Sequence, residues 1–210
     1  MGSMDAFEDR MRRGGMGATR EAAKFFMKAD PVHQTLQDVC RRLEELGICY
    51  AVVGGMALVA HGYDRTTADV DILVAPEGLE LIHRSLSGLG YVPPFAESKN
   101  LRDTATGVLI EFIVAGQFPG DGKPKPVSFP KPDEVAVDID GVRYANLPTL
   151  IELKLASGMT NPGRLRDLAD VQELIRALRL PGDFAEKLNA YVRGKFAELR
   201  LPVQDNFERQ

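Results

Sequence analysis

Asp69 and Asp71, separated by one residue in an apolar segment, are the side chains of this chain best suited to hold a metal ion. In a strand, residues two apart project from the same face, so the two carboxylates would share one small volume while Val70 and Ile72 face the core. Like charges this close either raise a pKa or recruit a cation, and Mg²⁺ commonly binds through one or two carboxylates together with substrate phosphates. The pattern therefore predicts a site for a magnesium nucleotide.

Gly54 and Gly55 predict a phosphate-binding turn upstream of the two aspartates. Residues 50–53 are predicted to form a short buried strand, and residues 56–60 the first turns of a helix whose free N–H groups would face an anion. Taken alone, a Gly-Gly pair is usually only a turn, and an Asp-x-Asp pair is more often a solvated strand end. Their combination at this spacing, with a strand before and after, favours nucleotidyl transfer.

Glu111 interrupts the apolar, strongly β-forming segment 108–114. A charged group in a sheet core is costly unless it is paired or bound to metal. Glu111 is therefore either a third carboxylate beside Asp69 and Asp71 or the polar-face residue of a half-exposed strand.

Lys154 lies in the apolar stripe of a helix predicted to begin at Leu147. Its stem could carry the amine out to water, or the amine could reach a phosphate or the carboxylates. A lone lysine in such a stripe is predicted to contribute little to folding. Asn161 and Pro162 predict the start of a helix that continues to about Leu178. In that helix Asp167 lies on the inward edge, and Arg166 and Asp170, four apart, could form an exposed ion pair.

Residues 115–133 contain too many glycines and prolines for a regular element and predict a long loop. Its lysines, at positions 123, 125 and 131, could reach an anionic substrate or could merely keep a connector soluble. After the loop, residues 135–139 and 142–145 predict a hairpin through Asp140-Gly141. Further helices are predicted over residues 31–46, 76–89 and 183–199.

The run VVGGMALVAHGYDRTTADVDILV, residues 52–74, resembles the motif of the DNA polymerase β-like nucleotidyltransferase superfamily, in the bacterial branch that includes AbiEii-type toxins. The segment LPTLIELKLASGMTNPGRLRDLADVQEL is similar to later motifs of that group. The resemblance implies metal ligation by Asp69, Asp71 and Glu111, with Lys154 as a further catalytic residue. Many relatives carry Ser or Thr where this chain has Met56, which leaves phosphate binding to the backbone there. The implied nucleotide-binding residues are Gly54, Gly55, Met56, Arg65, Thr66, Arg164, Arg166 and Asp167.

The same resemblance implies an α+β nucleotidyltransferase fold, a mixed twisted sheet flanked by helices, with a C-terminal helical part. The implied reaction is Mg²⁺-dependent transfer of a nucleoside monophosphate from a nucleoside triphosphate, ATP among the candidates, to an acceptor hydroxyl. The acceptor could be RNA such as tRNA, a protein or a small molecule, and a toxin would have an antitoxin protein as partner. The alternative is a catalytically inactive nucleotide-binding or protein-interaction module of the same fold.

Composition predicts a globular cytoplasmic protein with no membrane contact. The 210 residues are 44% hydrophobic and carry a net charge of -4. This net charge does not favour electrostatic binding of nucleic acid over a large surface. Cys40 and Cys49 lie in no metal-binding spacing, which predicts reduced thiols. We predict a mobile arm over residues 1–30, with a tag remnant at 1–3, a nucleotidyltransferase core over 31–146 and a helical part over 147–210.

Overall fold

The structure is a computed structural model that describes the backbone of residues 30–207 and the side chains of residues 30–203. The predicted tag remnant and nearly all of the predicted arm lie outside the described residues. Among the described residues, no helix is both long enough and apolar enough to cross a membrane.

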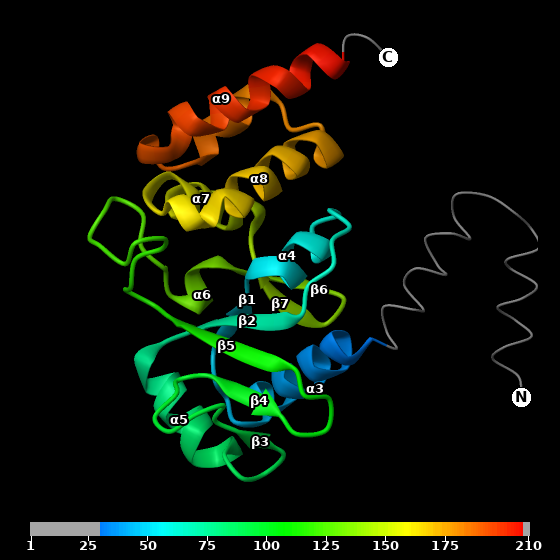
Figure 1. The fold of residues 1–210 in the computed structure, drawn as a ribbon, viewed down its shortest axis with the longest axis vertical. Helices are drawn as coiled ribbons and strands as arrows, with labels where there is room; N and C mark the ends of the chain where they lie inside the picture. Colours follow the sequence, from blue (N-terminus) through cyan, green and yellow to red (C-terminus); the bar gives the residue numbers. More distant parts are fainter. Residues whose placement is uncertain (1–29, 208–210) are drawn as a thin grey trace, which may run out of the picture.

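A seven-stranded mixed sheet with the order β3-β4-β5-β2-β1-β7-β6 forms the centre of the molecule (Figure 1). At its middle, β2 pairs antiparallel with β1 and parallel with β5. Antiparallel pairs extend the sheet outward at both edges. The strands are β1 (Tyr50–Val52), β2 (Asp69–Val74), β3 (Tyr91–Val92), β4 (Leu101–Asp103), β5 (Leu109–Val114), β6 (Ala136–Ile139) and β7 (Val142–Ala145).

Helices cover both faces of this sheet. Figure 1 shows α3 (Pro31–Glu45) and α5 (Pro76–Leu86) on one side, with α4 (Gly54–Ala60) and α6 (Pro132–Val135) on the other. Alternation along β2 sends Val70 and Ile72 into the fully buried core that also contains Leu36 of α3. The other face of the same strand carries Asp69 and Asp71, so it is free to build a polar site.

The C-terminal helices pack on the α4 side of the sheet. They are α7 (Leu147–Thr160), η1 (Pro162–Arg164), α8 (Leu165–Leu178), η2 (Gly182–Lys187) and α9 (Ala190–Phe207). The Asn146 side chain caps α7 by accepting a hydrogen bond from the Thr149 N–H at 3.0 Å. Phe184 and Phe196 stack with their ring centroids 5.7 Å apart, and this contact holds η2 against α9.

Most predicted elements are present, and the hairpin turn is formed by Asp140 and Gly141, both with positive φ. Several boundaries were wrong. The helix predicted to reach Leu89 ends at Leu86, and Leu89 is 65% exposed instead of packed. The helix predicted over 183–199 is split into η2 and α9, and the one predicted from Pro162 begins with a 3-10 turn. Strands β3 and β4 were not predicted, because two or three residues are too few to show a period.

Candidate active site

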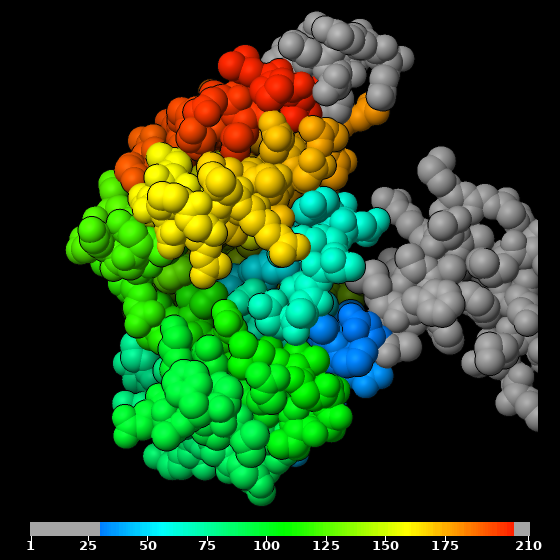
Figure 2. Space-filling model, in the orientation of Figure 1, coloured from blue at the N-terminus to red at the C-terminus, as the bar shows by residue number. Residues whose placement is uncertain are grey.

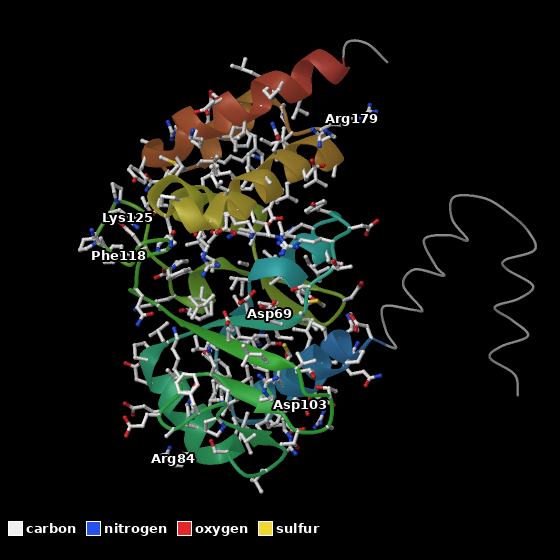
Figure 3. The ribbon with its side chains drawn as sticks, viewed as in Figure 1. Asp69, Arg84, Asp103, Phe118, Lys125 and Arg179 are labelled. Atoms are coloured by element: carbon white, nitrogen blue, oxygen red, sulfur yellow. The ribbon has the colours of Figure 1, made fainter. Side chains whose placement is uncertain are left out.

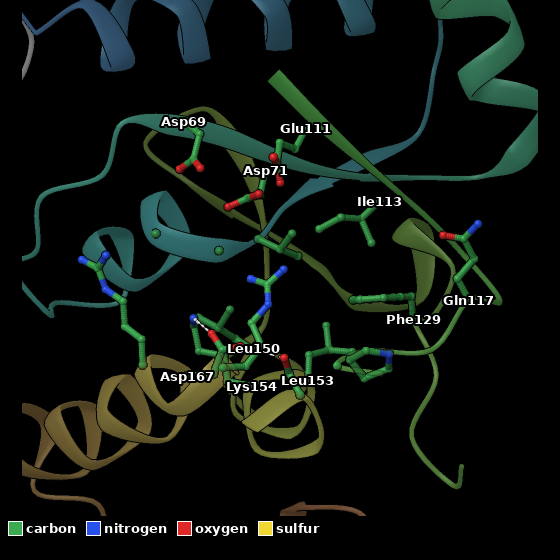
Figure 4. A pocket seen from close by; sticks show the side chains of 18 of the residues that line it. Asp69, Asp71, Glu111, Ile113, Gln117, Phe129, Leu150, Leu153, Lys154 and Asp167 are labelled. Atoms are coloured by element: carbon green, nitrogen blue, oxygen red, sulfur yellow. Dashed lines mark hydrogen bonds and ion pairs between the residues drawn. The ribbon is translucent and has the colours of Figure 1, made fainter. Parts of the chain in front are cut away.

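Three carboxylates converge on the polar face of the sheet, where β2 and β5 run side by side. The parallel register pairs Asp71 directly with Glu111, so both side chains project from the same face as Asp69. Ligand oxygens of the three residues lie within 4.8 Å of one another (Figure 4). Glu111 therefore lies with the two aspartates as predicted, and the cluster offers the hard oxygen donors that suit Mg²⁺.

The glycine turn closes tightly over these carboxylates. The Val53 N–H donates to the Asp71 carbonyl at 2.9 Å, which ties the end of β1 to β2. Gly54 follows with a φ of +61°, and a Cβ at this position would lie 1.8 Å from the Asp71 Oδ2 atom. A Cβ on Gly55 would lie 2.5 Å from the Thr67 Oγ1 atom. Both positions favour glycine, because a Cβ there would displace the Asp71 or Thr67 side chain.

The Asp71 carboxyl is the electrostatic centre of the cluster. Burial, with the nearby charges of Asp69 and Glu111 as smaller contributions, raises its pKa from 3.8 to about 7. The Lys154 ammonium and a hydrogen bond from the Gly55 backbone oppose this shift. A cation bound among the three carboxylates would offset both the burial of the Asp71 charge and its repulsion by Asp69 and Glu111. The cluster is therefore suited to bind a metal ion.

Lys154 belongs to a buried network of charges that joins α7, α8 and the segment between α4 and β2. Its amine is 2.9 Å from the Asp167 Oδ1 atom and 2.8 Å from the Asp170 Oδ2 atom. Arg65 pairs with Asp170 at 2.5 Å, and the Ser157 hydroxyl donates to Asp167 at 2.7 Å. Asp170 is only 3% exposed, so the exposed pair with Arg166 considered from the sequence is wrong.

Removing Lys154 should cost considerable stability, contrary to the expectation from sequence. Lys154→Ala leaves two carboxylates without their shared buried cation, so we expect the free energy of unfolding to fall by about 3 kcal/mol. Lys154→Met, which keeps the apolar stem, should lose nearly as much, because the missing charge dominates. Urea denaturation without nucleotide measures both. Lys195→Ala breaks the surface pair with Glu198 and should change stability by less than about 0.5 kcal/mol; an equally small effect at Lys154 would contradict the role of this network.

A cavity of about 620 Å³ opens between the sheet and the helical part, with the three carboxylates in its wall. Figure 2 shows the surface hollowed where the yellow helical segment meets the cyan and green core. Predicted site residues that line it from other elements are Gly54, Gly55, Arg65, Lys154, Arg164, Arg166 and Asp167. Arg164 and Arg166 are exposed, so their cationic groups are available to a ligand.

Met56 and Thr66, the remaining predicted site residues, lie elsewhere. Both line a second cavity, together with His33 and Val59, and Arg65 and Thr67 line both cavities. Met56 is only 5% exposed and packs in the core. The structure therefore does not bring Met56 or Thr66 to the wall of the carboxylate cavity.

The glycine- and proline-rich segment is an ordered wall of the cavity. Lys125, which Figure 3 shows in the same loop as Phe118, is buried and donates to the Pro119 carbonyl at 2.5 Å and to the Thr160 hydroxyl at 3.2 Å. It also pairs with Asp121. Lys123 and Lys131 are exposed and do not line the cavity. Of the three lysines, Lys125 thus anchors the loop to the end of α7.

Several cavity residues carry no signal that sequence reasoning used. The Thr67 hydroxyl donates to the Asp69 Oδ1 atom at 2.8 Å and orients that carboxylate. Its position two residues before Asp69 could have suggested this contact. Lys99, Gln117 and Phe129 come from loops far along the chain, and only the folded chain brings them to the carboxylates.

Comparisons with known proteins identify the fold. No protein-family model matches the sequence, and no curated protein matches it either. The solution structure of the antibiotic-resistance factor ANT(2'')-Ia matches with a TM-score of 0.53 at 15% identity, over 86% of this chain and 100% of that chain. An antigenic nucleotidyltransferase-like protein from Paracoccidioides brasiliensis matches with a TM-score of 0.51 at 16% identity, over 83% and 89% of the two chains. The chain therefore has the nucleotidyltransferase fold, as the sequence predicted.

Proposed function

We propose that this protein is a Mg²⁺-dependent nucleotidyltransferase that moves a nucleoside monophosphate from a nucleoside triphosphate to an acceptor hydroxyl. The observation that carries the proposal is the cluster of Asp69, Asp71 and Glu111 directly beside the Gly54-Gly55 turn, in the wall of an open cavity. A site that binds phosphate together with its metal ion needs the carboxylates and the glycine turn close enough for one triphosphate to contact both. The nucleotidyltransferase fold of the chain supports the same reaction class.

Asp69, Asp71 and Glu111 would hold Mg²⁺, which when bound would neutralise the phosphates and stabilise the charge that develops during transfer. Gly54, Gly55 and the following backbone N–H groups would contact the terminal phosphates. Arg164 and Arg166, exposed in the cavity wall, would add positive charge. Lys154 would act electrostatically on Asp71, while Asp167 and Asp170 hold the Lys154 amine in place and Arg65 pairs with Asp170.

In the proposed reaction the acceptor oxygen forms a bond to the α-phosphorus as the bond from that phosphorus to the bridging β-phosphate oxygen breaks. Pyrophosphate leaves with the bridging oxygen and its electron pair. Glu111 would help to activate the acceptor hydroxyl by taking up its proton. The acceptor classes are RNA such as tRNA, a protein and a small molecule. A toxin paired with an antitoxin, as in the AbiEii-type branch, is one form of this function.

The second candidate is an inactive module that binds a nucleotide or a protein partner. Two observations favour it: Met56 stands where many relatives have a hydroxyl residue, and the third acid is Glu111 where Asp is commoner. The deciding experiment incubates the protein with Mg²⁺, each labelled triphosphate and pools of tRNA, protein and small hydroxyl compounds. A mass increase of one nucleoside monophosphate on an acceptor, with release of pyrophosphate, supports the transferase. Binding of nucleotide without transfer to any acceptor supports the module.

Nucleotide binding should itself require divalent metal, because a triphosphate and three clustered carboxylates repel one another without it. Calorimetry should show that at least one of ATP, GTP, CTP and UTP binds in the presence of Mg²⁺. In EDTA the affinity for that nucleotide should be at least about tenfold lower. Equal affinity in the two conditions, or no binding in either, would count against the site.

A further inference from the structure

The cavity has two ends of different chemistry. One end carries the three carboxylates and the glycine turn, whereas the other carries the apolar side chains of Ile113, Phe129 and Leu153. Figure 4 shows Asp69 at the first end and Gln117 and Phe129 at the second, with Ile113 between them. A nucleoside triphosphate has the same division, with charge at one end and a flat, largely apolar ring at the other.

The sheet itself connects the two ends. Glu111 and Ile113 are two residues apart on β5, so they project from the same face about 7 Å apart along the strand. Beyond Ile113 the backbone places an aromatic ring across the cavity: the Gly116 N–H donates to the Phe129 carbonyl, and the Phe129 N–H donates to the Gln117 carbonyl, both at 2.8 Å. Phe129 is therefore held in register with the segment that continues β5.

The apolar end is held by hydrogen bonds, and Ile113 and Phe129 are partly exposed there while Leu153 is buried. The loop that carries Phe129 is tied to the helical part through Lys125 and through Asn161, whose side chain donates to the Gly120 carbonyl at 3.2 Å. Phe129 packs partly against both core clusters yet keeps part of its surface in the cavity wall. A preformed aromatic surface of this kind binds a ring without first being ordered.

We propose that Ile113, Phe129 and Leu153 form the surface that receives the base of the nucleoside triphosphate, with the Gln117 amide at its edge. This inference rests on the proposed function, which puts the phosphates at the carboxylates. Phe129 and Leu153 contact the ring faces, and the Gln117 amide, which both donates and accepts, is suited to the polar edge of a base.

The test separates the ring from the phosphates. Calorimetry in Mg²⁺ compares the tightest-binding nucleoside triphosphate with inorganic tripolyphosphate, which has the charge but no base. In the wild-type protein the nucleotide should bind more tightly. Phe129→Leu keeps an apolar side chain but removes the aromatic face, so nucleotide affinity should fall about tenfold while tripolyphosphate affinity stays unchanged. Phe95→Leu changes a phenylalanine that is 69% exposed and lies outside the cavity, and it should alter neither.

The remaining outcomes overturn the inference in distinguishable ways. If Phe129→Leu leaves nucleotide binding unchanged and raises the KM for an acceptor, the apolar surface receives the acceptor instead of the base. If nucleotide and tripolyphosphate weaken together, Phe129 acts only through the fold. If neither ligand binds the wild-type protein, both the proposed function and the base site are contradicted.

Discussion

Replacing Asp71 with asparagine should lower nucleotide transfer by about three orders of magnitude or more, because it removes a charged ligand from the metal site at nearly constant volume. The rate of monophosphate transfer at saturating Mg²⁺ and nucleotide is the measurement. If expression of the wild-type protein arrests cell growth, the same substitution should restore growth at equal protein level. Full transfer activity in the variant would exclude Asp71 from the reaction.

The same variant should be more stable than the wild type when metal is absent. The pKa of Asp71 is about 7 in the folded protein against an ordinary value of 3.8, so the folded state binds this proton more tightly than the unfolded state does. The stabilisation from this proton is fully present below about pH 4 and is lost as pH rises through about 7. Asparagine carries no such charge, so at pH 8 Asp71→Asn should gain about 1 to 3 kcal/mol, and the gain should shrink at pH 5.

Thermal unfolding in EDTA at the two pH values checks this sign and serves as the folding control for the activity measurement. Mg²⁺ should raise the Tm of the wild type at pH 8 and raise that of Asp71→Asn much less, because one ligand is missing. An inactive variant that is also less stable in EDTA would mean that the substitution damages the fold, and the loss of transfer could then not be assigned to the metal site.

Gly54→Ala should lower nucleotide transfer by about 100-fold without replacing any charged residue. The new methyl group would lie 1.8 Å from the Asp71 Oδ2 atom, so either the carboxylate or the turn must move. A misplacement of about 1 Å at a reacting centre can cost about 100-fold in rate, and here the displaced group is itself a proposed metal ligand. The φ of +61° adds a backbone penalty of about 1 kcal/mol.

Gly88→Ala is the matched control for this substitution. Gly88 also has a positive φ, +81°, but a Cβ there would meet no atom within 4 Å. It should lose about 1 kcal/mol of stability from the backbone alone and keep full activity. Transfer rates and urea denaturation of both variants provide the comparison. Equal behaviour of the two would show that the close approach of Gly54 to Asp71 is unimportant.

The sequence by itself determined the local features of this site. The Asp-x-Asp alternation, the glycine turn and the cap at Asn161 each depend on residues a few positions apart, where strand periodicity and backbone geometry act directly. The resemblance carried by residues 52–74 led to the correct fold class. It also led to Glu111 as a neighbour of the aspartates, a choice that periodicity alone left open.

Only the tertiary structure decided which distant groups share the site. The register of β2 and β5 places Asp71 beside Glu111. Lys154 of α7 is held by two carboxylates of the following helix, α8. The sequence left open whether the Lys154 amine reaches water or an anionic group, because its carboxylate partners lie 13 and 16 residues away, outside the reach of helical spacing. Met56 packs in the core instead of lining the carboxylate cavity. Which neighbours a helical side chain contacts is decided by packing against distant parts of the chain, which the local sequence does not show.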